Sequence, residues 1–183
     1  MTVAAVILAA SPASALADAD GTPGVRRLTD VAWAGGATPV VVCSFDPDGA
    51  VTAALANAEV TLVDPADPVG GPVGQMVNGV RAAVTLVTAT DAALVWPARM
   101  AWVDAETVTT LIAAHGDDRS TVLRPAYDGE PGWPAAGDSP AAAAPRASPP
   151  TTAATRTPMI IGRRTGVDTR TPRVPVELGR AAR

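Results

Sequence analysis

Lysine is absent from this 183-residue chain, in which all 14 basic residues are arginine. Its absence excludes a phosphate-binding lysine of the Walker type, a Schiff base and a lysine general base. The chain has one cysteine and one histidine, which excludes an internal disulfide and a zinc site built from Cys and His ligands. Aromatic residues make up only 3% of the chain, so Ala, Val and Leu have to build most of a core.

The charge is unevenly distributed along the chain. Residues 1–135 hold 6 Arg and 15 acidic residues, a net charge of −9, whereas residues 136–183 hold 8 Arg and 3 acidic residues, a net charge of +5. The overall charge of −4 argues against broad nonspecific binding to nucleic acid. No apolar run approaches the roughly 20 residues of a membrane-spanning helix, so we expect a cytoplasmic protein without a membrane partner.

The composition changes abruptly near residue 136. The stretch from there to the end holds seven Pro and eight Arg but no aromatic residue. Because it buries too little apolar surface to offset its ordering entropy, we predict one domain over 1–135 and a disordered basic tail over 136–183. The tail is either solvated without a role, or it folds back or binds an acidic partner or RNA. A frameshift in a GC-rich gene, leaving a truncated product, is a further hypothesis.

Apolar runs alternate with helical patterns before that boundary. Strands are predicted over residues 3–10, 39–45, 59–64, 91–97 and 120–125, and helices over residues 23–35, 48–57, 75–86 and 105–115. Continuous apolar strands that alternate with helices are typical of a mostly parallel sheet covered on both faces. We therefore predict an α/β, Rossmann-like three-layer fold, with functional residues in loops at the carboxyl ends of the strands.

The first 20 residues allow a second interpretation. VAAVILAA is an apolar run, and SALA resembles the small-residue cleavage site of a signal peptide. Residues 1–16 contain no Arg, so the positively charged start of such a peptide is missing. An exported small domain that begins near Asp18 stays as an alternative.

Five stretches of the chain follow one another in the order found in a known family. They are VILAASPASALAD, ATPVVVCSF, GGPVGQMVNGVRAAV, DAALVWPARMAWVDAETVTTLIAAH and LRPAYDGEPGWP. Over residues 2–135 this order resembles the MobA-like nucleotidyltransferase domains, which load GTP or CTP onto molybdopterin, and is similar to the wider group of sugar-phosphate nucleotidylyltransferases. The resemblance implies an NTP transferase fold with a nucleotide as partner.

The first loop of that family reads roughly LAAG-x-S-x-RMG, with a lysine soon after. Glycines let backbone N–H groups approach the triphosphate, and Arg and Lys neutralise its charge. This chain matches at Ala9 and Ala10, but Ser11 stands at the glycine position and Ala15 at the arginine position. The resemblance makes Ala9, Ala10, Ser11 and Ser14 candidate nucleotide-binding residues in a loop that lacks the charged groups.

Two later elements complete the expected site. Gly74 and Gln75 match a glycine-rich turn before a helix that binds base and phosphates in the family; the alternative is a plain turn into a core helix. Arg99 stands where the family has an aspartate that holds Mg²⁺. A guanidinium cannot ligate Mg²⁺, but it can pair with a phosphate or a carboxylate. Trp96 and Trp102 lie on the two sides of Arg99. One interpretation is that their rings stack on a base or on Arg99; the other is that they fill the core.

Two single residues have structural expectations. Cys43, in VVVCSF, is predicted to be a buried strand thiol, and His115 is predicted to lie at a helix end.

The replacements of the family's Arg, Lys and metal-binding Asp lead to our functional expectation. We expect a nucleotidyltransferase-like pseudoenzyme that has no catalytic residues and no resident metal, and the sequence identifies no cofactor. We expect it to bind a nucleotide (GTP or CTP) or a partner protein. By the resemblance, the partner is a molybdoenzyme or a maturation protein for molybdenum cofactor. The alternative is an active nucleotidyltransferase that uses Mg²⁺ and an NTP, with Asp64, Asp67 or Asp91 in place of the lost ligand.

Overall fold

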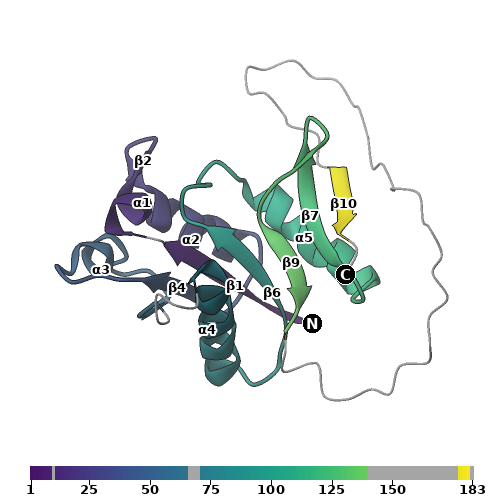
Figure 1. Cartoon of the computed structure of the whole chain (residues 1–183), viewed down its shortest axis with the longest axis horizontal. Helices are drawn as coiled ribbons and strands as arrows, with labels where there is room; N and C mark the ends of the chain where they lie inside the picture. The colour runs from purple at the N-terminus through teal and green to yellow at the C-terminus, as the bar shows by residue number, and fades with distance from the viewer. Residues whose placement is uncertain (10, 66–70, 140–176, 182–183) are drawn as a thin grey trace.

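The chain forms a central sheet between two layers of helices (Figure 1). The structure is a computed structural model that describes residues 1–9, 11–65, 71–139 and 177–181. The helices are α1 (Pro12–Leu16), α2 (Gly24–Ala34), α3 (Ala50–Ala54), α4 (Gly71–Leu86) and α5 (Ala105–Asp117). The strands are β1 (Thr2–Ala9), β2 (Asp18–Ala19), β3 (Thr22–Pro23), β4 (Val40–Ser44), β5 (Thr61–Val63), β6 (Thr90–Pro97), β7 (Val122–Tyr127), β8 (Glu130–Pro131), β9 (Ala135–Asp138) and β10 (Glu177–Ala181).

The main sheet has the strand order β10-β7-β9-β6-β1-β4-β5, with β8 paired to β7. Strand β1 is central and pairs in parallel with both β4 and β6, and β5 extends the parallel part. The remaining strands are antiparallel to their neighbours. The predicted α/β fold with a mostly parallel sheet is confirmed, and the export alternative would require removal of its central strand.

The two faces of β1 supply two separate apolar cores. One face packs under α2 and α5 through Val3, Ala5, Ile7 and Ala9, and the other packs under α4 through Ala4, Val6 and Leu8. Both sets are buried, which explains the continuous apolar sequence of this strand.

Helix α4 approaches the sheet closely at Gly79. A Cβ built at this position would overlap Val6 Cγ1 and lie 2.8 Å from Cys43 Sγ. Cys43 is buried, as predicted, and burial raises the pKa of its thiol to about 11.

Three boundaries differ from the predictions. Residues 12–16, expected as loop, form the short helix α1, and α4 begins at Gly71 rather than at Gln75. Pro72 fits the start of α4 because the first helical turn does not need its missing N–H. Strand β9 crosses the predicted boundary of the tail, with Ala136 paired to Leu94 of β6, and β10 is a strand within the tail. The rest of that tail, 140–176 and 182–183, lies outside the described residues.

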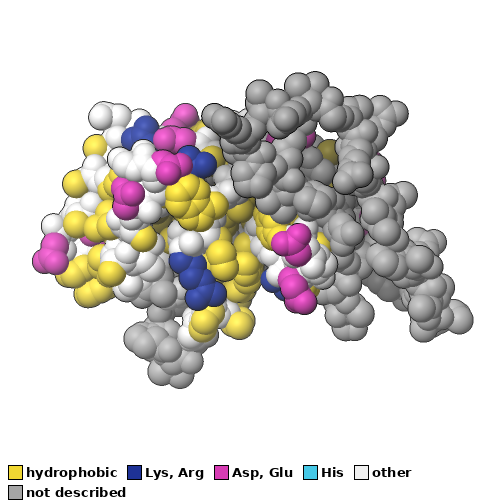
Figure 2. All heavy atoms as spheres, turned by 90° about the horizontal axis from the view of Figure 1, so that it is seen from above, with side chains coloured by type: hydrophobic (Ala, Val, Ile, Leu, Met, Phe, Trp, Pro, Cys, Tyr) yellow, Lys and Arg dark blue, Asp and Glu magenta, His cyan; other side chains and the backbone are white. Residues whose placement is uncertain are grey.

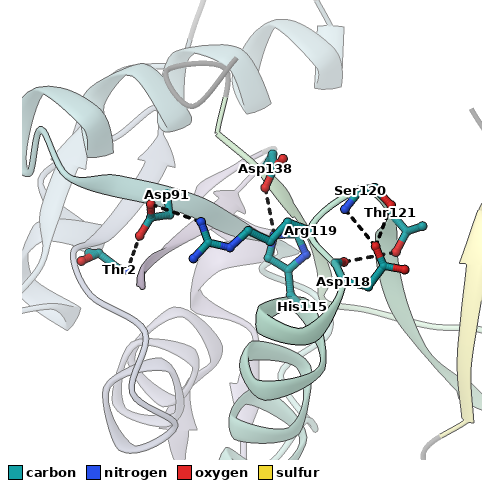
Figure 3. Close-up of polar contacts among 8 residues, drawn as sticks. All are labelled: Thr2, Asp91, His115, Asp118, Arg119, Ser120, Thr121 and Asp138. Atoms are coloured by element: carbon teal, nitrogen blue, oxygen red, sulfur yellow. Dashed lines mark hydrogen bonds and ion pairs between the residues drawn. The ribbon is translucent and has the colours of Figure 1, made fainter. Parts of the chain in front are cut away.

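A polar network ties the strands together at their amino-terminal edge (Figure 3). The N–H of Thr2 donates to Asp91 Oδ2 at 2.8 Å, and Arg119 Nη1 lies 3.7 Å from Asp91 Oδ1. Nearby, Nε2 of the buried His115 lies 3.2 Å from Asp138 Oδ1. Helix α5 continues past His115 to Asp117, so this side chain is a core residue near the helix end.

None of the helices in the described part of the chain combines the length and the apolar character that a membrane span requires.

Candidate functional site

The loop that follows β1 is closed by hydrogen bonds within itself. Ser11 is the N-cap of α1, and its Oγ accepts from the N–H of Ser14 at 3.2 Å. In return, Ser14 Oγ accepts from the N–H of Ser11 at 3.1 Å and donates to the Ser11 carbonyl at 2.8 Å. The N–H of Ala15 also donates to the Ser11 carbonyl, at 3.1 Å. The amides of these three residues are therefore already paired, and Pro12 has none.

The structure brings the predicted residues of this loop to the expected edge of the sheet. Ala9 is the last residue of β1 and is buried against the α2 side of the core, so its side chain does not face a ligand. Ser11 and Ser14 follow directly and are half-buried. Ala10 lies outside the described residues.

Gly74 and Gln75 lie inside the first turns of α4, not in a turn before it. The Gln75 carbonyl accepts a long contact from the Cys43 thiol, 3.7 Å from Sγ, which ties this end of the helix to β4. The amide groups of the first helical turn are donors without partners inside the helix. Pro72 has no N–H, so Gly71, Val73 and Gly74 carry the backbone N–H groups at this end of α4.

Arg99 lies in the turn that follows β6. The N–H of Ala98 donates to the Leu8 carbonyl at 2.8 Å, and the N–H of Met100 donates to the Pro97 carbonyl at 2.9 Å. These bonds fix the turn beside the end of β1. The Arg99 side chain is exposed and makes no hydrogen bond or ion pair within residues 1–9, 11–65, 71–139 and 177–181. An anion arriving at this edge of the sheet can therefore reach its guanidinium.

The two tryptophans around Arg99 have different roles. Trp96 is fully buried, and its Nε1–H donates to the Met100 carbonyl at 3.2 Å, so it packs the core and holds the turn. Trp102 is 65% exposed, and the guanidinium of Arg27 lies 5.6 Å from its ring centre. Arg27 Nε also donates to the Ala101 carbonyl at 2.8 Å. Sequence reasoning missed Arg27, because α2 and this turn are far apart along the chain.

The described acidic side chains near the ends of the strands lie in different surroundings. The Asp46 carboxylate accepts from the Thr52 hydroxyl and from the N–H groups of Val51 and Thr52 in α3, and these bonds hold the pKa of Asp46 below its ordinary value. Asp64 is exposed after β5, and Asp67 lies outside the described residues. Asp91, one of the three alternative replacements for the lost metal ligand, lies at the opposite, amino-terminal edge of the sheet, away from this turn.

Arg99, at the position that the family resemblance assigns to a Mg²⁺ ligand, does not fit that ion. Mg²⁺ needs oxygen ligands in near-octahedral geometry, usually carboxylates and phosphates. Arg99 supplies no oxygen, and the carboxylate of Asp46 is engaged by α3. Among the described residues, no group of three or more His, Cys, Asp and Glu side chains could hold a metal ion.

Large hydrophobic side chains are also exposed among the turns that carry the candidate residues. Phe45 follows β4 and is 58% exposed, Val73 begins α4 and is 67% exposed, and Met100 lies beside Arg99. Figure 2 shows one face of the molecule on which hydrophobic side chains are mixed with Arg and acidic side chains. Aromatic residues, Met and Arg are enriched in protein interfaces, so this edge has the composition of a binding surface.

Solved structures share this fold. A nucleotidyl transferase from Methanothermobacter thermautotroptrophicus is 22% identical, with 76% of this chain and 72% of that chain covered and a TM-score of 0.59. A Mycobacterium tuberculosis H37Rv protein in complex with manganese is 20% identical, with coverage of 78% and 76% and a TM-score of 0.55. A CMP:2-keto-3-deoxy-manno-octonic acid synthetase complexed with CTP is 18% identical, with coverage of 68% and 52% and a TM-score of 0.53.

These structures show the fold, and the family model identifies the family. No curated protein matches the chain. The model of the MobA-like NTP transferase domain matches residues 5–160, which is most of the chain and includes most of β1 and all of β2 to β9. The chain therefore belongs to the MobA-like NTP transferase domain family.

Proposed function

We propose that this chain is a pseudoenzyme of its family: a nucleotide-binding accessory protein that does not transfer nucleotidyl groups. The observation that carries the proposal is the closed loop after β1. A phosphate loop needs free N–H groups that converge on the ligand. The N–H groups of Ser11 and Ser14 instead serve the capping box of α1.

The turn after β6 supports the same proposal. Transfer in this family needs a divalent cation at the reacting phosphates, whereas this chain presents the fixed positive charge of Arg99. A guanidinium can bind a phosphate bidentately without a metal. Arg99 and the amides at the start of α4 are the groups that we expect to hold a nucleotide, with Gly74 and Gln75 beside its phosphates or base.

The biological setting is proposed from the family alone. MobA-like domains act on molybdenum cofactor, so we place the accessory role in the maturation of the cofactor or of a molybdoenzyme. The exposed Trp102 and Phe45 would contact the partner protein.

Calorimetric titration of the full chain with CTP, GTP and ATP, each in EDTA and in Mg²⁺, tests the proposal. We expect binding of CTP or GTP without Mg²⁺. Binding should be unchanged or weaker in Mg²⁺, because the ion neutralises part of the charge that Arg99 pairs with. The variant Arg99→Ala should bind about tenfold more weakly, as expected for the loss of one charge-assisted hydrogen-bonding group.

The matched control is Arg81→Ala. Arg81 is an exposed arginine on α4, ten residues beyond Gly71 and therefore about 15 Å from the start of that helix. Its replacement changes the net charge equally and should leave the affinity unchanged. Binding that strengthens in Mg²⁺ and is followed by pyrophosphate release would establish the enzyme alternative instead. Absence of any nucleotide binding would leave a protein-binding role only.

A further inference from the structure

Strand β10 closes one side of the sheet from a distant part of the chain. Glu177–Ala181 runs antiparallel to β7, with Glu177 opposite Ala126 and Ala181 opposite Val122. In the sequence, 38 residues separate it from β9, the preceding described strand, which ends at Asp138. In Figure 1 it is the yellow arrow beside β7, at the end of the sheet away from β5.

Strand β7 needs a partner on this side. Its other side pairs with β9 at one position, Leu123 with Ala136, and with β8 at Ala126 and Tyr127. Five of the six β7 residues pair with β10 on the outer side. A β7 edge without β10 would expose a row of backbone N–H and C=O groups, which is a template for another strand.

Two observations separate β10 from the rest of the fold. The family match ends at residue 160, so β10 is not part of the matched domain. In the described sheet, β7 is the one strand that pairs with β10. A short edge strand held by a single neighbour opens more easily than the central strands of a sheet.

We propose that the outer edge of β7 is a strand-binding site that Glu177–Ala181 occupies in cis. The site takes an extended peptide segment in antiparallel orientation, bound through its backbone. The chain's own strand competes with any such segment, because tethering gives it a high effective concentration. The strand therefore acts as a built-in competitor, and its release would open a peptide-binding edge on the domain.

The test uses the full chain with G179P and R180P combined. In a strand, the N–H groups of successive residues point to opposite sides, so one of any two consecutive residues faces β7. Proline has no N–H, and two consecutive prolines therefore remove one hydrogen bond to β7 whichever of the two residues makes it. We expect hydrogen exchange in residues 122–127 to be about tenfold faster in this variant. Exchange in β1 and β6 should be unchanged, which shows that the domain stays folded. The matched control, G179A with R180A, keeps both N–H groups and should exchange like the wild type.

A synthetic peptide with the sequence of residues 174–183, VPVELGRAAR, then probes the opened edge. It should bind the proline variant, return β7 exchange to the wild-type rate, and bind the wild type at least about tenfold more weakly, because β10 fills the site there. The same peptide with both prolines should not bind. Unchanged β7 exchange in the proline variant, equal peptide binding to both proteins, or no binding to the variant would each overturn the proposal.

Discussion

The hydroxyls of Ser11 and Ser14 each accept a hydrogen bond from the other residue's backbone N–H, at 3.2 and 3.1 Å. This reciprocal pair turns the segment after the central strand into the start of a helix. The N–H groups of both serines are used to hold α1. Two serine hydroxyls are therefore enough to cap the start of α1.

The cap predicts a specific order of stabilities. Ser11→Ala should lower the free energy of unfolding by about 1 kcal/mol, the usual cost of removing an N-cap hydroxyl. Ser11→Gly should cost only a few tenths of a kcal/mol, because glycine is itself tolerated at an N-cap. Urea denaturation of the two variants measures the difference. Equal stabilities for wild type and Ser11→Ala would show that the cap contributes nothing.

Two helical glycines should respond to alanine in opposite directions. At Gly79 the new Cβ would meet Val6 and Cys43, and overpacking of this kind costs about 1–3 kcal/mol. The better helix propensity of alanine returns about 0.5–1 kcal/mol, so Gly79→Ala should be destabilising overall. At Gly116 the nearest atom is Met1 Cε at 3.6 Å, an ordinary contact.

Gly116→Ala should therefore stabilise the protein by about 0.5–1 kcal/mol, with no packing penalty. Chemical denaturation of both variants measures the sign of each change in the free energy of unfolding. A stabilising Gly79→Ala would mean that α4 can move away from the sheet at no cost.

Cys43 predicts a pH dependence at high pH. Its pKa is raised by burial from 9.0 to about 11 in the folded protein. The folded state then holds the thiol proton more tightly than the unfolded state does, so this contribution to stability is complete below pH 9 and is lost as pH rises toward 11. The free energy of unfolding of the wild type should fall over this range relative to Cys43→Ala. Parallel pH profiles for the two proteins would contradict the prediction.

Most of the parallel part of the sheet could be predicted from the sequence. Strands such as Val40–Ser44 are buried on both faces, so their residues form continuous apolar runs with little ambiguity. Strand β9 could not be predicted in this way, because Ala135–Asp138 is short and consists mainly of small residues. Its pairing with β6 depends on neighbours that are distant in sequence. Helix α1 was missed because Ser and Pro also favour loops.

The candidate site was predictable in outline. The order of strands and loops placed Ser11 and Arg99 at one edge, because parallel strands end together. The stacking of Arg27 on Trp102 had no signal in the sequence, since it joins α2 to the turn after β6. Asp91 lies far from Arg99 because it stands at the start of β6, whereas Arg99 follows its end.

The polar network around Asp91 has a practical consequence for protein engineering. Asp91 lies at the start of β6 and Arg99 lies just beyond its end, so these two edges of the sheet are roughly 20 Å apart. Effects of substitutions at such a separation normally add within about 0.5 kcal/mol. Gains in stability made at the Asp91 edge can therefore offset losses caused by substitutions at the Arg99 edge. Substitutions that probe the candidate site can thus be combined with stabilising ones at the far edge, and their effects measured separately.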